Sequence, residues 1–207
     1  QSNKITIYQA DCMEMLPQIP DKYYQLCVCD PPYGIGKRLS QGAGKLKRTS
    51  LQRLDSSWDI APDGKYFDEL FRVSKNQIVW GANNFELPPS EYFLCWNKEQ
   101  AMPNFATLEY AWVSMGLKKP AKLFTYSIHK HNQVDKVHPT QKPIPLYDWI
   151  LQNYAKEGDK ILDTHLGSMS IAIACADLGY DLTGCELDKE YFDKGIERVK
   201  NHLKQAQ

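Results

Sequence analysis

The stretch that decides the fold is "DKILDTHLGSMSIAIACADLGYDLTGCELD", residues 159–188. It opens with an apolar run that ends at Asp163 and passes through a turn that contains Gly167. A helix rich in small residues follows, and a second strand ends at Glu186. A strand, a helix and another strand in this order are typical of a βαβ unit in a parallel sheet.

The two acids at the strand ends indicate a ligand site. Asp163 and Glu186 are 23 positions apart, and in dinucleotide-binding folds an acid about 20 residues after the glycine turn binds ribose hydroxyls. The pattern G-x-G-x-x-G is absent, and "GAGK" (42–45) does not fit a P-loop, so a phosphate-bearing dinucleotide is poorly supported. Taken alone, the stretch also fits an ordinary strand, turn and helix with surface acids.

The rest of the chain repeats this alternation of strands and helices. Strand-like runs lie at 4–11, 23–30, 77–81, 92–98, 108–116 and 122–128. Helical spacing is found at 63–74 and 143–158, with Gly158 as the expected stop, and in a last helix with Phe192, Ile196, Val199 and Leu203 on one face. We therefore predict one α/β domain over 1–207, with a doubly wound, mainly parallel, Rossmann-like sheet.

Composition narrows the class of protein. The 207 residues carry 25 basic and 25 acidic side chains, so bulk charge favours neither nucleic acid nor a membrane surface. No segment approaches the roughly 20 apolar residues of a membrane span. Six scattered cysteines favour free, buried thiols, and we expect a cytoplasmic protein. His129 and His131 are interpreted as part of a polar loop, and no metal site is predicted.

The run "LCVCDPPYGIG" (26–36) predicts a rigid turn at the end of a buried strand, which would hold hydrogen-bond acceptors and an aromatic ring in fixed positions. Asp30 ends the apolar run, and the two prolines that follow have a fixed φ and no N–H. The Asp30 carboxylate and the Pro31 carbonyl are therefore expected to be rigid acceptors without a competing donor. Tyr33 adds a flat face.

Two fixed acceptors beside an aromatic ring suit a planar aromatic amine. The exocyclic nitrogen of adenine or cytosine is a weak nucleophile because its lone pair is delocalised into the ring. Acceptors that hold both of its N–H bonds would aim this lone pair at an electrophile, such as the alkyl group of a sulfonium. An ordinary strand-terminating turn is the alternative for "DPPY" on its own.

With these pieces the chain resembles the β class of amino-group DNA methyltransferases, which depend on S-adenosylmethionine. Three blocks carry the resemblance in the order of that class: "DPPYG" (30–34), "HPTQKP" (138–143), and "ILDTHLGS" (161–168) with "CELD" (185–188). The resemblance implies a circularly permuted motif order, a DNA substrate and direct in-line transfer of the methyl group to a flipped-out base.

The resemblance also implies site residues. Those expected to engage the target base are Asp30, Pro31, Pro32 and Tyr33. Those expected around the cofactor are Asp11, Asp30, Gln141, Lys142, Asp163, Thr164, Gly167, Ser168, Glu186 and Leu187.

The cofactor turn departs from the usual family string, D-P-F-x-G-S-G-T. Thr164 and His165 replace Pro-Phe, and Met169 replaces the last glycine, which puts a side chain where the helix begins near the ligand. We expect the His165 ring to be packed. Asp before Pro-Pro-Tyr favours adenine N6 as the target. The alternatives are cytosine N4 and an inactive, methyltransferase-like subunit that binds nucleic acid.

Between Pro31 and Leu54 the chain has no acidic residue. We predict that 35–57 is a mobile basic loop that grips phosphates, while 82–137 supplies core strands and a minimal recognition insertion. The residues expected to bind DNA are Lys37, Arg38, Lys45, Lys47, Arg48 and Arg53. A homodimer and a cognate restriction system are left open as further partners.

Overall fold

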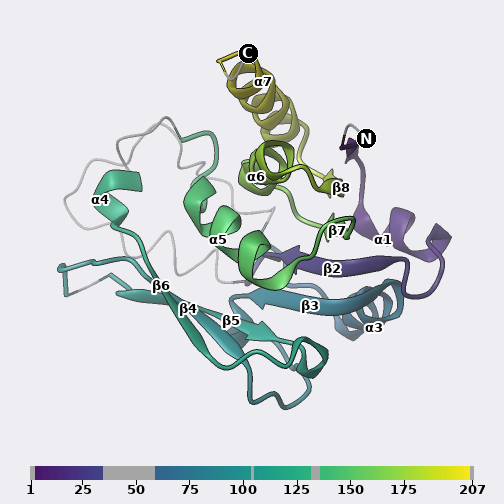
Figure 1. Cartoon of the computed structure of the whole chain (residues 1–207), viewed down its shortest axis with the longest axis horizontal. Helices are drawn as coiled ribbons and strands as arrows, with labels where there is room; N and C mark the ends of the chain where they lie inside the picture. Colours follow the sequence, from purple (N-terminus) through teal and green to yellow (C-terminus); the bar gives the residue numbers. More distant parts are fainter. Residues whose placement is uncertain (1–2, 35–58, 104, 132–135, 206–207) are drawn as a thin grey trace.

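The computed structural model describes residues 3–34, 59–103, 105–131 and 136–205. In this part of the chain an eight-stranded mixed sheet has the order β1-β8-β7-β2-β3-β5-β4-β6 (Figure 1). Only β5 runs against its two neighbours, β3 and β4. The strands are β1 (Ile5–Gln9), β2 (Tyr24–Cys29), β3 (Ser74–Trp80), β4 (Phe93–Asn97), β5 (Leu108–Val113), β6 (Lys122–Thr125), β7 (Lys160–Asp163) and β8 (Asp181–Glu186).

Helices cover both faces of the sheet, as the prediction of a doubly wound fold requires. One face packs against α5 (Ile144–Tyr154), α6 (Ser170–Leu178) and α7 (Lys189–Gln205). The other face packs against α1 (Cys12–Met15) and α3 (Gly64–Val73). The remaining helical segments are η1 (Leu16–Gln18), η2 (Ala82–Asn84), η3 (Met115–Leu117) and α4 (Ile128–His131).

The strand β2 shows why its sequence is apolar from Leu26 to Cys29. Leu26 and Val28 belong to the core beneath α5, α6 and α7, whereas Cys27 and Cys29 belong to the core beneath α3. Successive side chains of a strand point to opposite faces, so a central strand with helices on both faces needs apolar residues at every position.

The candidate residues gather at one edge because β1, β8, β7, β2 and β3 are parallel and adjacent. After β7 the chain continues into α6 on one face, and after β2 it leads to α3 on the other. The space beyond the ends of β7 and β2 is therefore a topological switch point, where open α/β sheets bind ligands.

Two expectations about local structure are wrong. The helix expected to stop at Gly158 ends at Tyr154, because Ala155 is extended and residues 156–159 form a separate turn closed by Asp159 N–H to Lys156 O. The predicted polar loop at His129 and His131 includes the short helix α4, and His131 is buried.

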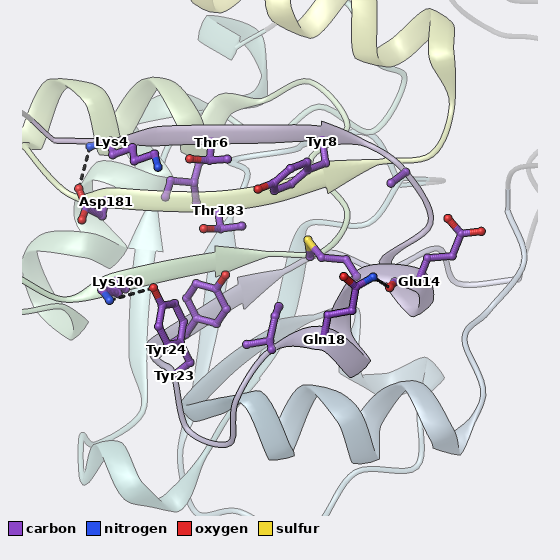
Figure 2. Close-up of a pocket in the computed structure, with 14 residues that line it drawn as sticks. Lys4, Thr6, Tyr8, Glu14, Gln18, Tyr23, Tyr24, Lys160, Asp181 and Thr183 are labelled. Carbon is purple, nitrogen blue, oxygen red and sulfur yellow. Dashed lines mark hydrogen bonds between the residues drawn. The ribbon is translucent and has the colours of Figure 1, made fainter.

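A second pocket, of about 520 Å³, lies between the strands β1 and β8 and the helical segments α1 and η1 (Figure 2). Thr6, Tyr8 and Thr183 line it, and Lys160 Nζ lies 3.0 Å from the hydroxyl of Tyr23. Polar strand residues fit this face because Thr6, Tyr8 and Thr183 are partly open to solvent. Among the described residues, no helix is long and apolar enough to cross a membrane.

Candidate active site

A cleft of about 1340 Å³ lies at the carboxyl ends of the parallel strands. It is lined by Asp30 and Tyr33 after β2, by Gly167 after β7 and by Glu186 at the end of β8. The two halves of the predicted site therefore share one cavity. The other predicted residues that line it are Asp11, Pro31, Pro32, Gln141, Lys142, Thr164, Ser168 and Leu187.

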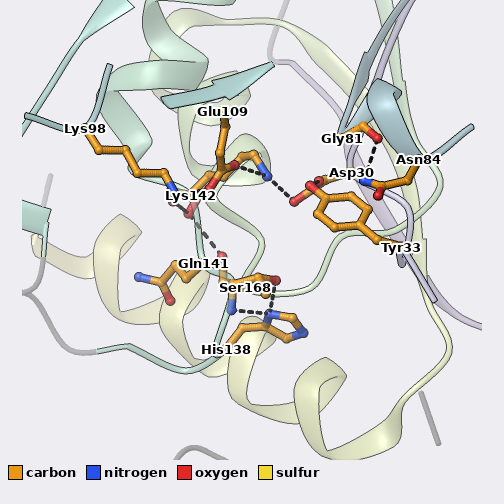
Figure 3. Close-up of polar contacts among 12 residues, drawn as sticks. Asp30, Tyr33, Gly81, Asn84, Lys98, Glu109, His138, Gln141, Lys142 and Ser168 are labelled. Atoms are coloured by element: carbon orange, nitrogen blue, oxygen red, sulfur yellow. Dashed lines mark hydrogen bonds and ion pairs between the residues drawn. The ribbon is translucent and has the colours of Figure 1, made fainter. Parts of the chain in front are cut away.

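The Asp30 carboxylate accepts two hydrogen bonds within the protein. The Tyr33 hydroxyl donates to Asp30 Oδ1 at 2.5 Å, and Lys142 Nζ donates to Asp30 Oδ2 (Figure 3). The expectation that Asp30 has no competing donor is therefore wrong. The prolines remove local backbone donors, but the fold brings in a lysine 112 positions away. A carboxylate has about four acceptor sites, so two remain open.

The fold holds Tyr33 from two sides. Asp59 Oδ1 accepts the N–H groups of Tyr33 and Gly34 at 2.9 and 3.0 Å, which fixes the turn after the prolines. The Tyr33 ring lies against Gly81, where a Cβ atom would be only 2.0 Å from Cε1 of the ring. Phe85 meets the ring edge-on at a centroid distance of 6.1 Å. Burial above all raises the pKa of Tyr33, so the phenol stays protonated.

Glu186 fixes the turn between β7 and α6. Its Oε2 atom accepts the N–H of Gly167 and its Oε1 atom that of Asp188, both at 2.8 Å. Gly167 has a φ of +49°, a conformation that favours glycine. Burial raises the pKa of Glu186. The exposed side chain of Leu187 lies next to Glu186 at the rim of the cleft.

Two of the departures from the family string form a packed polar cluster. The Thr164 hydroxyl lies 2.6 Å from the Tyr66 hydroxyl and 3.0 Å from Nδ1 of His165. The His165 ring packs edge-on against Tyr66 at a centroid distance of 5.3 Å. Burial lowers the pKa of His165 to about 4, so the ring is neutral at physiological pH.

The third departure, Met169, points away from the cleft. Its side chain is fully buried and lies against Gly195 of α7, where a Cβ would meet Met169 Cγ and Sδ at 2.8 Å. Met169 does not belong to the cleft lining. Its backbone has a φ of +60°, which is unusual for a residue with a side chain. The expected intrusion of this side chain at the ligand is therefore wrong.

The segment 138–143 lines the cleft with His138, Thr140, Gln141 and Lys142. Oε1 of Gln141 accepts the N–H of Val137, and its carbonyl lies 2.6 Å from His131 Nε2. Its buried Nε2 atom has no hydrogen-bond partner among the described residues. A buried amide donor without a partner is costly, which points to an acceptor supplied by a ligand.

Asp163 does not line the cleft with the other predicted residues. It is buried at the end of β7, and its Oδ1 atom accepts the N–H of His165 at 2.9 Å. Burial above all raises the pKa of Asp163 to about 8. Its place in the structure is that of a support for the turn after β7.

Several residues of the site carried no motif in the sequence. Lys98, Glu109, Asp59 and Asn84 line the cleft, and Arg198 of α7 donates to Ser168 O at 2.6 Å. The one available signal was Glu109, an acid within an apolar strand. The six residues predicted to bind phosphates lie outside the described residues, as does the predicted mobile loop 35–57.

The chain is similar to known proteins along most of its length. It is 25% identical over 250 residues to the type II methyltransferase M.HinfI of Haemophilus influenzae, a match that covers 94% of this chain and 68% of that protein.

Two solved structures show the same fold. An M1.HpyAVI–SAM complex matches with a TM-score of 0.60 and 19% identity, over 94% of this chain and 99% of the other. The PvuII DNA methyltransferase, described as cytosine-N4-specific, matches with a TM-score of 0.60 and 13% identity, over 99% of this chain and 93% of the other.

The family described as DNA methylase (N6_N4_Mtase) matches residues 75–197, more than half of the chain. The block "DPPYG" precedes the block "ILDTHLGS" in the sequence, and both line one cleft. The chain therefore belongs to this family of DNA methylases, with the motif order of its β class.

Proposed function

We propose that this protein transfers a methyl group from S-adenosylmethionine to the N6 amino group of adenine in DNA. The observation that carries the proposal is the shared cleft, in which Asp30 and Tyr33 lie together with Gly167 and Glu186. A site for an amino group and a site for a nucleoside are thus parts of one cavity.

The residues of the cleft fit this cofactor. Glu186 keeps acceptor capacity for ribose hydroxyls beyond its two backbone bonds, and the unpartnered Nε2 of Gln141 suits the carboxylate of the methionine part. Asp11 and Leu187 line the rim, where the adenine of the cofactor would lie. When bound, the sulfonium supplies an electrophilic methyl group and a neutral leaving group.

The role of the chain itself is to position the target amine. Asp30 has two acceptor sites left after Tyr33 and Lys142 have bound it, and the Pro31 carbonyl is a second rigid acceptor beside it. Tyr33 offers a ring that Gly81 and Asp59 hold in place. These groups orient the nitrogen lone pair, and catalysis rests on position and electrostatics.

Adenine is favoured by Asp30, since an aspartate before Pro-Pro-Tyr is typical of the adenine-N6 enzymes that this chain resembles. Cytosine N4 is the second candidate, supported by the fold shared with the PvuII enzyme. An inactive subunit is less well supported, because Met169, one of the residues that suggested it, packs against Gly195 instead of entering the cleft.

The β4–β5 hairpin is our candidate for contact with the DNA at the mouth of the cleft. Its two ends contribute Lys98 and Leu108 to the cleft lining. In the turn between Lys98 and Leu108, the N–H of Phe105 donates to Met102 O at 3.1 Å. The side chains of Met102 and Phe105 are about half exposed. Apolar side chains placed in this way suit the space that an extruded base leaves in the stack. The basic residues from Lys37 to Arg53 remain predicted phosphate contacts.

The test is to methylate plasmid DNA with the purified protein and analyse its nucleosides by mass spectrometry. We expect N6-methyladenine, and we expect Asp30→Ala to abolish it, while the exposed control Asp68→Ala on α3 leaves it unchanged. N4-methylcytosine alone would establish the second candidate. Saturable binding of S-adenosylmethionine without any modified base would contradict both.

A further inference from the structure

Behind the Asp30 carboxylate lies a chain of four charged side chains of alternating sign. Lys142 Nζ contacts Asp30 Oδ2 and lies 3.1 Å from Glu109 Oε2. The other oxygen, Glu109 Oε1, lies 2.5 Å from Lys98 Nζ. Figure 3 shows the side chains of Lys98, Glu109 and Lys142 next to one another in space, with Lys142 directed at Asp30.

These four residues come from separate parts of the chain. Lys98 follows β4, Glu109 lies near the start of β5, and Lys142 lies two residues before the first residue of α5. Because β5 runs antiparallel to β3 and β4, its first residues lie at the edge where β4 ends. This reversal is what brings an acid of β5 beside the catalytic turn that follows β2.

Burial makes the pairing of Lys142 obligatory. Its side chain is 2% exposed, while those of Asp30 and Glu109 are 15% and 27% exposed. Burial alone would lower the pKa of Lys142, but the two carboxylates raise it well above the usual lysine range. Burial would likewise raise the pKa of Glu109, yet Lys142 and Lys98 hold it at about 2. Both groups are therefore charged at neutral pH.

The ammonium of Lys142 is thus shared between two carboxylates. If Glu109 lost its charge, Lys142 would be paired with Asp30 alone, and the attraction between them would strengthen in this partly buried site. Asp30 would then present less negative charge to a further N–H donor. Glu109 pairs with Trp96 of β4 through its main chain, so a change of its side chain leaves this pairing in place.

We propose that Glu109 is a positioning residue for methyl transfer, and that Lys98 acts through it. Glu109 shares the Lys142 ammonium with Asp30 and fixes it between the two carboxylates. The remaining acceptor sites of Asp30 are thereby available to the amino group of the target base. This inference rests on the proposed function, because it concerns the same site.

The experiment is a comparison of single-turnover methyl-transfer rates with binding. We expect Glu109→Gln to slow transfer by about tenfold or more, since positioning and local charge act on the chemical step. The dissociation constants for S-adenosylmethionine and for DNA should be unchanged. Glu109→Asp, which keeps the charge, should recover part of the rate. The matched control is Glu190→Gln, which removes an exposed ion pair with Lys194 and should have no effect.

A double-mutant cycle tests the link to Lys98. We expect Lys98→Met to slow transfer in the wild-type background, and to add nothing in the Glu109→Gln background, because Lys98 acts only through Glu109. Circular dichroism and thermal unfolding would show whether each variant is folded. If Glu109→Gln does not fold, Glu109→Asp and Lys98→Met still decide the question, since wild-type rates in both would refute the proposal.

The outcomes separate this inference from the proposed function. A wild-type protein that methylates no DNA would contradict the proposed function itself. An active wild type with an equally fast Glu109→Gln variant would overturn only the role of Glu109. Loss of rate that is matched by an equal loss of cofactor affinity would instead assign Glu109 to cofactor binding and would also overturn the proposal.

Discussion

The Tyr33 ring rests directly on the backbone of Gly81, at the end of the neighbouring strand. A Cβ atom on Gly81 would lie 2.0 Å from Cε1 and 2.4 Å from Cζ of Tyr33, far inside any real contact distance. Gly81 also has a φ of +66°, so glycine meets both a conformational and a steric need. The position of the aromatic ring in the cleft thus depends on a residue outside the catalytic block.

Gly81→Ala should displace Tyr33 and reduce methyl transfer by about 100-fold, since a shift of about 1 Å in a reacting group has effects of that order. The matched control is Gly158→Ala in the turn before β7. Gly158 also has a positive φ, of +82°, but a Cβ atom added there would meet no described atom within 4 Å beyond its chain neighbours. Both variants should lose about 1–2 kcal/mol of stability from the strained backbone. Only Gly81→Ala should lose activity in a single-turnover assay, and equal activity of the two variants would refute this role of Gly81.

Met169→Ala should separate stability from cofactor binding. Removing a fully buried methionine leaves a cavity against Gly195 and should cost about 2–5 kcal/mol in the free energy of unfolding. Affinity for S-adenosylmethionine, measured by calorimetry at a temperature where the variant is folded, should stay unchanged because the side chain lies outside the cleft lining. Leu178→Ala, at a partly exposed position at the end of α6, is the control for stability. A large loss of affinity in Met169→Ala would contradict the packing role.

Glu186→Gln should weaken cofactor binding by about tenfold or more, because bonds to a charged acceptor are worth about 1.5–3 kcal/mol each. DNA binding should be unaffected, and Glu197→Gln on the exposed face of α7 is the control. Burial raises the pKa of Glu186, so wild-type affinity should fall as the pH is lowered toward that raised value and the carboxyl becomes protonated. Calorimetry across a pH series tests both statements, and an affinity independent of pH and of the substitution would contradict them.

Asp163 should make the fold less stable as the pH rises toward 8. Burial raises the pKa of its carboxyl to about 8, from an ordinary value near 3.8 in the unfolded chain. The stabilisation from the neutral acid is complete below the unfolded pKa and is lost as the pH rises through the folded one. Asp163→Asn removes this dependence. The free energy of unfolding of the variant, measured with urea, should therefore exceed that of the wild type by more and more as the pH rises from the unfolded pKa toward the folded one. Measurements at neutral and mildly alkaline pH avoid the titration of His131 and His165, because the lowered pKa of each ring is about 4. A constant difference between the two proteins would refute the shift.

The sequence alone determined the features that depend on neighbours in the chain. Continuous apolar runs with helices between them predicted the doubly wound sheet, because a strand covered on both faces has no polar side. The proline pair after Asp30 and the glycine turn before α6 predicted where the sheet would carry its site, since both follow the carboxyl ends of buried strands.

Only the tertiary structure decided how the site residues meet. Lys142 and Asp30 are 112 positions apart, and Glu109 reaches them because β5 is antiparallel to its neighbours. Likewise, the direction of Met169 depends on the space that Gly195 leaves in α7. Local patterns record what each strand or helix requires of its own residues. Contacts between side chains from different strands and helices depend on strand order and direction, which no single stretch of this sequence encodes.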